Sequence, residues 1–353
     1  MNMSSSDSKN SSPIGLVVNP RSGTDVRRAI AAAGSVTVAD KVNIVRRVVL
    51  GACEAGANRF IVQGDPHRII ERATETIRGV ELDWVKDPLT YSEQDTTNAV
   101  RYMHDQGGMG VVVLGGDGTN RVAALAWPDI PVIPVSTGTN NAFPIFVEAT
   151  VAGAAAGHLA LGQVSIDEIA QRSKVVRLEV CDQNGISEEP DLALIDAVAV
   201  RDRYVGSLEL FDPETLSLAV LTQADPSSVG FAGVGGLIEE ISSSEDAGLL
   251  IRFLSPSKCN RVVRGPTAPG HYADLGLAET KKIGLGEEII LEGPVLLAFD
   301  GERKRRLVDG ARAIIRVQRD GPRVIDVAKV MRWAAQNETY ISENSKNRLL
   351  IGP

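Results

Sequence analysis

The sequence has few aromatic residues, few cysteines and no long apolar run. Of its 353 residues, 4% are aromatic and three are cysteines, Cys53, Cys181 and Cys259. The cysteines are far apart and lack metal-ligand spacing, so we expect reduced thiols. No apolar run reaches transmembrane length, and the N-terminus lacks the apolar segment of a secretory signal. These absences predict a cytoplasmic protein without a membrane partner.

An excess of basic charge is also missing. The net charge of -8 and the pI near 5.2 argue against a nucleic-acid partner, which normally needs a basic face. No G-x-x-x-x-G-K-[ST] and no H-R-D or D-F-G pattern is present, which excludes P-loop enzymes and protein kinases. The histidines are not spaced like pairs of metal ligands, so the sequence predicts no metal site built from them. They are His67, His104, His158 and His271.

The first half of the chain alternates apolar runs with amphipathic stretches. This alternation predicts a Rossmann-like α/β domain over residues 14–172 with a mostly parallel sheet, after a disordered tail at 1–13. Expected strands are 14–18, 59–63, 81–85, 111–115 and 131–136, and expected helices are 24–33, 41–56, 66–79, 92–107 and 141–161.

The second half has a different texture. Short β-rich runs such as "KVVRLEVC", "LALIDAVAV" and "PVLLAFDGE" are broken by Gly, Pro, Asp and Ser, with no long helical pattern between them. This predicts a β-rich, sandwich-like domain over residues 173–325. A helix is expected again within 324–336, so residues 326–353 form a C-terminal helix and a polar tail.

Four short polar stretches follow predicted strands. They are "NPRSG" (19–23), "GGDGTN" (115–120), "STGTNN" (136–141) and "DGE" (300–302). Each stretch alone has an ordinary interpretation as turn chemistry. The first three recur at one edge of a parallel sheet, which is where ligands bind in such folds.

Small residues at that edge leave backbone N–H groups exposed, and a helix is expected after each loop. Oriented amides and a helix N-terminus together make an anion site. Arg21 either pairs with a phosphate or is a solvated surface residue. The sequence therefore predicts phosphate binding by the residues Asn19, Ser22, Gly23, Gly115, Gly116, Gly118, Thr119, Asn120, Thr137, Gly138, Thr139 and Asn140.

Taken together, the four stretches resemble the superfamily of NAD kinases and diacylglycerol/sphingosine-type kinases. Within it, "KVNIVRR" (41–47), an expected "RGPTAPG" loop (264–270) and "VVVLGGDGTNRVAA" look like the ATP-NAD kinase-like AcoX family, named for acetoin catabolism. The resemblance covers both halves of the chain. It implies a Rossmann-like N-terminal domain, a β-rich C-terminal domain and a nucleotide site between them.

The resemblance also implies chemistry. The expected activity is phosphoryl transfer from ATP with Mg²⁺ to a small-molecule hydroxyl, which on NAD would make NADP. Asp117 would accept the hydroxyl proton or bind Mg²⁺ through water. Asp300 and Glu302 would support the cleft, or they would be only a charged turn. A homo-oligomer is a further possibility.

One departure leaves the acceptor open. The second NAD kinase motif, an Asn followed by an acidic residue, is not found, and "STGTNNAFP" is closer to the lipid-kinase branch. Two alternatives therefore stand beside the small-molecule kinase. They are a non-catalytic protein that binds nucleotide or NAD(H), and a lipid kinase, against which the low aromatic content and missing basic amphipathic helix argue.

Overall fold

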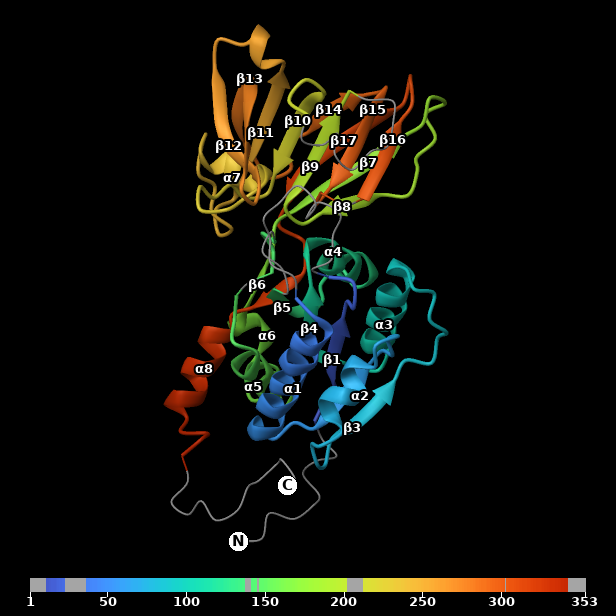
Figure 1. Cartoon of the computed structure of the whole chain (residues 1–353), viewed down its shortest axis with the longest axis vertical. Helices are drawn as coiled ribbons and strands as arrows, with labels where there is room; N and C mark the ends of the chain where they lie inside the picture. Colours follow the sequence, from blue (N-terminus) through green and yellow to red (C-terminus); the bar gives the residue numbers. More distant parts are fainter. Residues whose placement is uncertain are drawn as a thin grey trace.

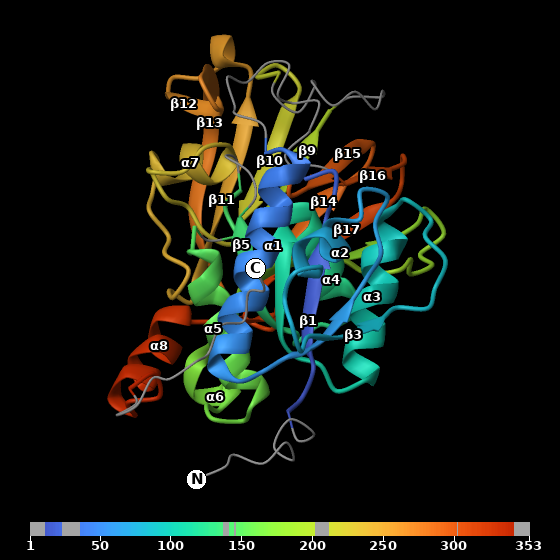
Figure 2. The same cartoon turned by 60° about the horizontal axis from the view of Figure 1, so that its bottom comes forward.

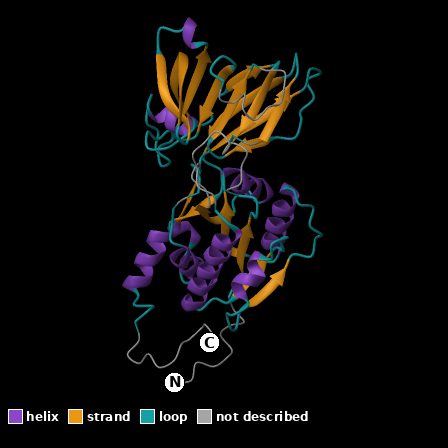
Figure 3. Ribbon diagram, viewed as in Figure 1, coloured by secondary structure: helices purple, strands orange, loops and turns teal. Residues whose placement is uncertain are grey.

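The computed structural model describes residues 11–22, 36–136, 141–144, 146–201, 212–301 and 303–341. Helices other than α7 (Phe231–Gly236) gather around one sheet in the lower half of Figure 1, and strands dominate the upper half (Figure 3). The predicted helix at 24–33 lies outside the described residues. The combination of an α/β part and an antiparallel β-rich part confirms the predicted fold class.

The first sheet has seven strands in the order β3-β2-β1-β4-β5-β18-β6. Every pair in it is parallel except β18 with β6. All five strands predicted for the first half are present, within two residues at each end. The strands are β1 (Ile14–Val18), β2 (Arg59–Val62), β3 (Glu81–Trp84), β4 (Met109–Gly115), β5 (Pro131–Ser136), β6 (Ala170–Arg172) and β18 (Arg323–Ile325).

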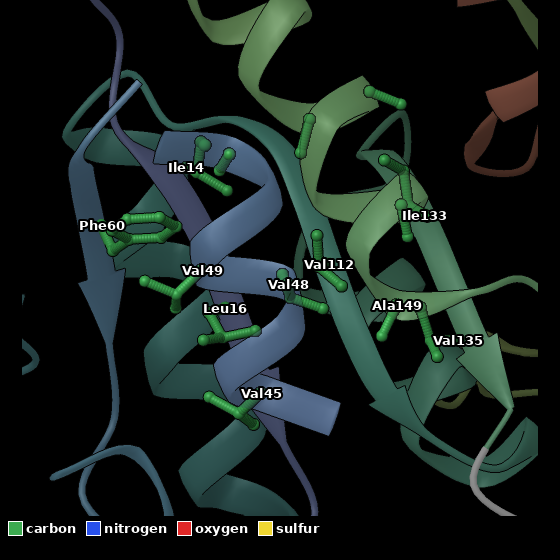
Figure 4. Close-up of a cluster of buried hydrophobic side chains, with 14 of the residues drawn as sticks. Ile14, Leu16, Val45, Val48, Val49, Phe60, Val112, Ile133, Val135 and Ala149 are labelled. Atoms are coloured by element: carbon green, nitrogen blue, oxygen red, sulfur yellow. The ribbon is translucent and has the colours of Figure 1, made fainter. Parts of the chain in front are cut away.

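Helices cover both faces of this sheet. One face packs against α1 and α5, where Leu16, Val48 and Val112 are fully buried (Figure 4). The other face packs against α3 and α4 through Val100, Met103 and neighbouring valines. The helices are α1 (Val38–Ala55), α2 (Ile69–Thr74), α3 (Glu93–Asp105), α4 (Asp117–Ala126), α5 (Ala149–Ala160), α6 (Ile166–Ile169) and α8 (Val327–Gln336).

Two of the predicted helices begin too early. The helix predicted at 66–79 begins at Ile69, because the Asp65 carboxylate accepts from the amides of His67 and Ile69 and closes a turn first. The helix predicted at 141–161 begins at Ala149, where Glu148 caps it. The amides of Ala142 and Phe143, inside the predicted span, donate to the Asp117 carboxylate instead. The helix predicted at 92–107 is α3, which begins after its N-cap Ser92.

The second half forms two antiparallel sheets. Their orders are β12-β13-β11-β10-β9-β15-β16 and β14-β17-β7-β8, and apolar residues from both sheets share one buried cluster. A short helix, α7 (Phe231–Gly236), covers the outer face of the larger sheet. The strands are β7 (Val175–Cys181), β8 (Asp191–Ala193), β9 (Asp196–Val200), β10 (Leu216–Leu221), β11 (Ala247–Leu254), β12 (Val262–Ala268), β13 (His271–Gly284), β14 (Ile289–Glu292), β15 (Val295–Phe299), β16 (Arg303–Leu307) and β17 (Arg312–Gln318).

Three local expectations for this half are wrong. The "RGPTAPG" loop is mostly strand β12, whose place at a sheet edge tolerates Pro266. The run "LALIDAVAV" is split between β8 and β9. The chain also returns to the first sheet at β18, which lies inside the stretch predicted as the β-rich domain. Strands β13 and β16 were missed because charged residues interrupt their apolar pattern.

Among the described residues, no helix is long and apolar enough to span a membrane. All three cysteines are unpaired, as predicted. Burial raises the pKa of the Cys53 thiol to about 11, so this thiol stays protonated near neutral pH.

Candidate functional site

Three of the four polar stretches meet at one edge of the first sheet. Gly115 at the end of β4 pairs with Ser136 at the end of β5. The Asn19 amide, just past β1, donates to the Leu114 carbonyl at 3.0 Å. The stretches that begin at residues 19, 115 and 136 therefore lie side by side. The predicted residues Gly23, Thr137, Gly138, Thr139, Asn140 and Glu302 lie outside the described part of the chain.

The turn after β1 is held by its own hydrogen bonds and by a buried lysine. Asn19 Oδ1 accepts from the Arg21 amide at 2.9 Å, and Ser22 Oγ donates to the Asn19 carbonyl at 2.9 Å. Lys41 of α1 is 1% exposed, and its Nζ donates to the carbonyls of Asn19, Pro20 and Ser22 at 3.2, 2.6 and 2.7 Å. Because these carbonyls point toward Lys41, the turn has a defined shape.

Asn19 also connects this turn to the glycine-rich stretch. Its Nδ2 donates to Thr119 Oγ1 at 2.8 Å, across one hundred residues of sequence. Both residues were predicted to bind phosphate, and the structure brings them into direct contact. The contact aligns the turn after β1 with the first turn of α4.

Most of the "GGDGTN" stretch is helix. Gly116 is the N-cap of α4, and Asp117 is its first residue. The first amides of a helix have no acceptor inside it, so this end of α4 offers N–H groups and the positive end of the helix dipole. A Cβ at Gly115 would lie 2.5 Å from Thr119 Cβ, and one at Gly116 would lie 2.9 Å from Asn141 Oδ1. The absence of side chains therefore permits this close packing.

The Asp117 carboxylate contacts the segment that follows β5. Its Oδ1 accepts from the Phe143 amide at 2.9 Å, and its Oδ2 accepts from the Ala142 amide at 3.2 Å. These bonds are not local turn bonds, because 25 and 26 residues separate the partners. Gln223 Nε2, from the β-rich part, donates to the Ala142 carbonyl at 3.1 Å. Asp117 thus orders a segment that touches both halves of the molecule.

Two further α4 residues are buried. Asn120 Nδ2 donates to the Gly116 carbonyl at 3.0 Å, and its buried Oδ1 has no partner within the described ranges. Arg121 is 1% exposed. Its guanidinium forms an ion pair with Asp191 of β8 and donates to the Leu192 carbonyl at 2.7 Å. Arg121 therefore joins α4 to the β-rich part.

Asp300 directly follows β15 and is buried, with 6% of its surface exposed. Its carboxylate accepts from the amides of Leu194, Ile195 and Asp196 at 2.9, 2.8 and 3.3 Å. Burial raises the pKa of Asp300, while the three amides and nearby Arg121 act in the opposite direction. The carboxylate thus fixes the bend between β8 and β9, and its contacts are with backbone.

No group of three or more acidic, histidine or cysteine residues in the described ranges could bind a metal by itself. A magnesium ion in a phosphoryl-transfer site is usually held by one or two carboxylates together with substrate phosphates. Asp117 supplies one carboxylate beside the amides of α4. The residues present therefore fit a magnesium ion that arrives with a nucleotide.

Sequence reasoning missed Lys41 and Arg121. A signal was available for Lys41, since it lies on the same helical stripe as Val45, Val48 and Ala52, where a charged residue must find buried partners. For Arg121 there was no such signal, because its partner Asp191 is 70 residues away in sequence.

Comparisons with known proteins agree with this architecture. The ATP-NAD kinase N-terminal domain model matches residues 14–164, and the acetoin catabolism protein X C-terminal domain model matches residues 176–320. The acetoin catabolism protein X of Cupriavidus necator is 31% identical over 333 residues, which is 92% of each chain. The chain belongs to the acetoin catabolism protein X family.

The fold of this family member is also that of a solved kinase. A crystal structure of yeast NADH kinase complexed with NADH superposes with a TM-score of 0.53 at 14% identity, covering 96% of this chain and 90% of the yeast chain. The resemblance inferred from "GGDGT" and its companion stretches is confirmed. The family name gives no activity by itself, so the chemistry rests on the site.

Proposed function

We propose that this protein is a phosphotransferase that moves a phosphoryl group from ATP, with Mg²⁺, to a hydroxyl of a small molecule, with NAD as the first acceptor to test. The observation that carries the proposal is the Asn19–Thr119 contact, which aligns the turn after β1 with the N-terminus of α4. Amides and hydroxyls there converge where nucleotide phosphates would lie. The kinase-like fold supports the same conclusion.

In this proposal the protein acts mainly by positioning and by charge stabilisation, because phosphoryl transfer needs little covalent help. Magnesium, when bound with the nucleotide, would neutralise phosphate charge. Asn19, Ser22, Thr119 and the first amides of α4 would orient the phosphates. Asp117 would accept the proton of the attacking hydroxyl or anchor the magnesium ion.

A binding protein without catalysis is the second candidate. The observation that favours it is the double hydrogen bond of Asp117 with the amides of Ala142 and Phe143, since these bonds use the carboxylate as a structural element. The same phosphate site would then sense ATP or NAD(H).

The test begins with a thermal-shift screen of the purified full chain against ATP with Mg²⁺, NAD and NADH. A ligand that binds the folded state raises the unfolding temperature by mass action. ATP turnover is then measured with each acceptor that binds. If no nucleotide shifts the unfolding temperature, the site proposal is wrong.

The variant Asp117→Asn separates the two candidates. A proton acceptor or metal anchor loses its charge, so turnover should fall roughly 10²- to 10⁴-fold while nucleotide affinity stays within a few fold. In a binding protein without catalysis the change would weaken the 142–143 contacts, so nucleotide affinity itself would fall. Nucleotide binding without turnover by the wild type would favour the binding protein.

A further inference from the structure

A cavity lies between the two halves of the molecule. It has a volume of about 720 Å³ and is lined by parts of β6, β18, α5 and α8, by residues 142–143 and 146–147, and by residues that follow β8 and β10. No described residue of the "NPRSG" or "GGDGTN" stretches lines it. Its size suits a drug-sized ligand. Figures 1 and 2 both show α8 and α5 together on one side of the molecule, away from α3.

The wall of the cavity is largely apolar. Phe143, Val147, Ile195 and Met331 contribute to it. Two further apolar residues at the cavity are unusually exposed for their type, with Phe146 82% and Val151 37% exposed. Apolar surface left open in this way favours a ligand with an apolar body.

The charged groups of the cavity are mostly cationic. Arg172, Lys174 and Lys329 line it, and Asp326 is its one acidic residue. Asp326 already serves α8, because its carboxylate accepts from the Lys329 amide at 2.9 Å as the N-cap. The Lys329 ammonium has neither a hydrogen bond nor an ion pair with any described residue. A cation without a counter-charge favours an anionic ligand.

Two more polar side chains at the cavity have hydrogen-bonding capacity left for a ligand. Ser173 Oγ lines the cavity, is buried and has no hydrogen-bond partner in the described ranges. The Lys174 ammonium donates to the carbonyls of Ser242 and Ala247 at 2.9 and 2.7 Å, which leaves its third N–H available. Burial lowers the pKa of Lys174 to about 8 even though Glu245 and Asp246 oppose this decrease, so an anion bound nearby would favour the charged ammonium.

We propose that this cavity binds a small amphipathic anion, with an apolar chain or ring against Phe143 and Met331 and a carboxylate or phosphate near Lys329 and Ser173. The site goes beyond the proposed kinase function and does not depend on it. Its ligand would contact Ala142 and Phe143, the residues whose amides Asp117 binds.

The test uses calorimetry on the full chain with three probes of equal chain length: octanoate, octyl phosphate and 1-octanol. Both anions should bind at least about ten-fold more tightly than the alcohol, and the tighter of the two identifies the head group. Saturating ATP with Mg²⁺ should leave their binding unchanged. If 1-octanol binds as tightly as the anions, the proposed anion site is wrong. Competition by ATP would show that the cavity belongs to the nucleotide site.

Variants on α8 locate the head group. Lys329→Gln removes one exposed charge at the cavity and should weaken both anions at least five-fold without changing 1-octanol. Arg332→Gln removes a charge from the same helix outside the cavity and should leave all three affinities unchanged. If the two variants behave alike, the head group is not at Lys329 and the proposal is wrong.

Discussion

Single buried charges decide much of this structure. Lys41, Arg121 and Lys174 are each under 5% exposed, and each donates hydrogen bonds to backbone carbonyls or to a buried carboxylate. Charged residues are rarely buried without such partners. Each of the three therefore fixes a particular piece of backbone: the turn after β1, the contact of α4 with β8, and the segment between Ser242 and Ala247.

Lys174 makes stability depend on pH. Its pKa of about 8 in the folded chain is below the 10.5 of an ordinary lysine, because of burial first and then Arg319, with Lys282 adding to the decrease and Glu245 and Asp246 opposing it. Between these values the unfolded chain binds more protons, so the free energy of unfolding should rise with pH through this window. Below pH 8 both states are protonated and the contribution is constant.

The measurement compares urea unfolding of the wild type and Lys174→Met at several pH values from 7.5 to 10. The wild type should gain stability relative to the variant by up to about 3 kcal/mol across the window. Lys86→Met, at a surface position, serves as the control. Its free energy of unfolding should differ from that of the wild type by the same amount at every pH. If the stability difference between the wild type and Lys174→Met is also independent of pH, Lys174 is not desolvated in the folded protein.

At the scale of elements, α1 and α5 approach each other closely. A Cβ on Gly153 would lie 2.0 Å from the Val48 carbonyl oxygen, and one on Gly51 would lie 2.0 Å from the Thr150 carbonyl oxygen. These glycines let two backbones approach where no side chain fits. The glycines within α1 and α5 therefore act through helix packing.

The variant Gly153→Ala should reduce the free energy of unfolding by at least about 2 kcal/mol, since the clash is with backbone and the helices must separate. Alanine otherwise favours a helix over glycine by roughly 1 kcal/mol, so a destabilisation would be due to packing. Gly64→Ala is the control, because nothing lies within 4 Å of its Cβ position. Stabilisation by Gly153→Ala in chemical denaturation would contradict the close approach of α1 and α5.

At the scale of the whole molecule, the buried pair of Arg121 and Asp191 joins the two halves. Removing one partner of such a pair leaves a charge in a buried place, so Arg121→Met should destabilise the protein by about 3–5 kcal/mol. The double variant Arg121→Met with Asp191→Leu should recover part of this loss, because the stranded carboxylate is gone.

Urea unfolding of the two single variants and the double variant measures the coupling. The exposed pair of Arg47 and Glu148 gives the comparison, since Arg47→Gln should change stability by less than about 1 kcal/mol. A loss for Arg121→Met as small as that for Arg47→Gln would show that the two halves are joined by other contacts.

The sequence by itself determined the fold class and the place of the candidate site. Buried parallel strands are continuous apolar runs, and local patterns such as Val111 to Val113 followed by "GGDGT" carry that information without any distant partner. Strand ends that share one sheet edge followed from the alternation of strands and helices. The family resemblance followed from the same short stretches.

Only the tertiary structure decided what the polar residues contact. It paired Asp117 with amides 25 and 26 residues away, and it placed Asp300 on three amides of the β8–β9 bend. It also brought β18 back to the first sheet and formed the cavity between the halves. These features arise from contacts between segments distant in sequence, and a local pattern of residues contains no information about which distant group satisfies a buried charge.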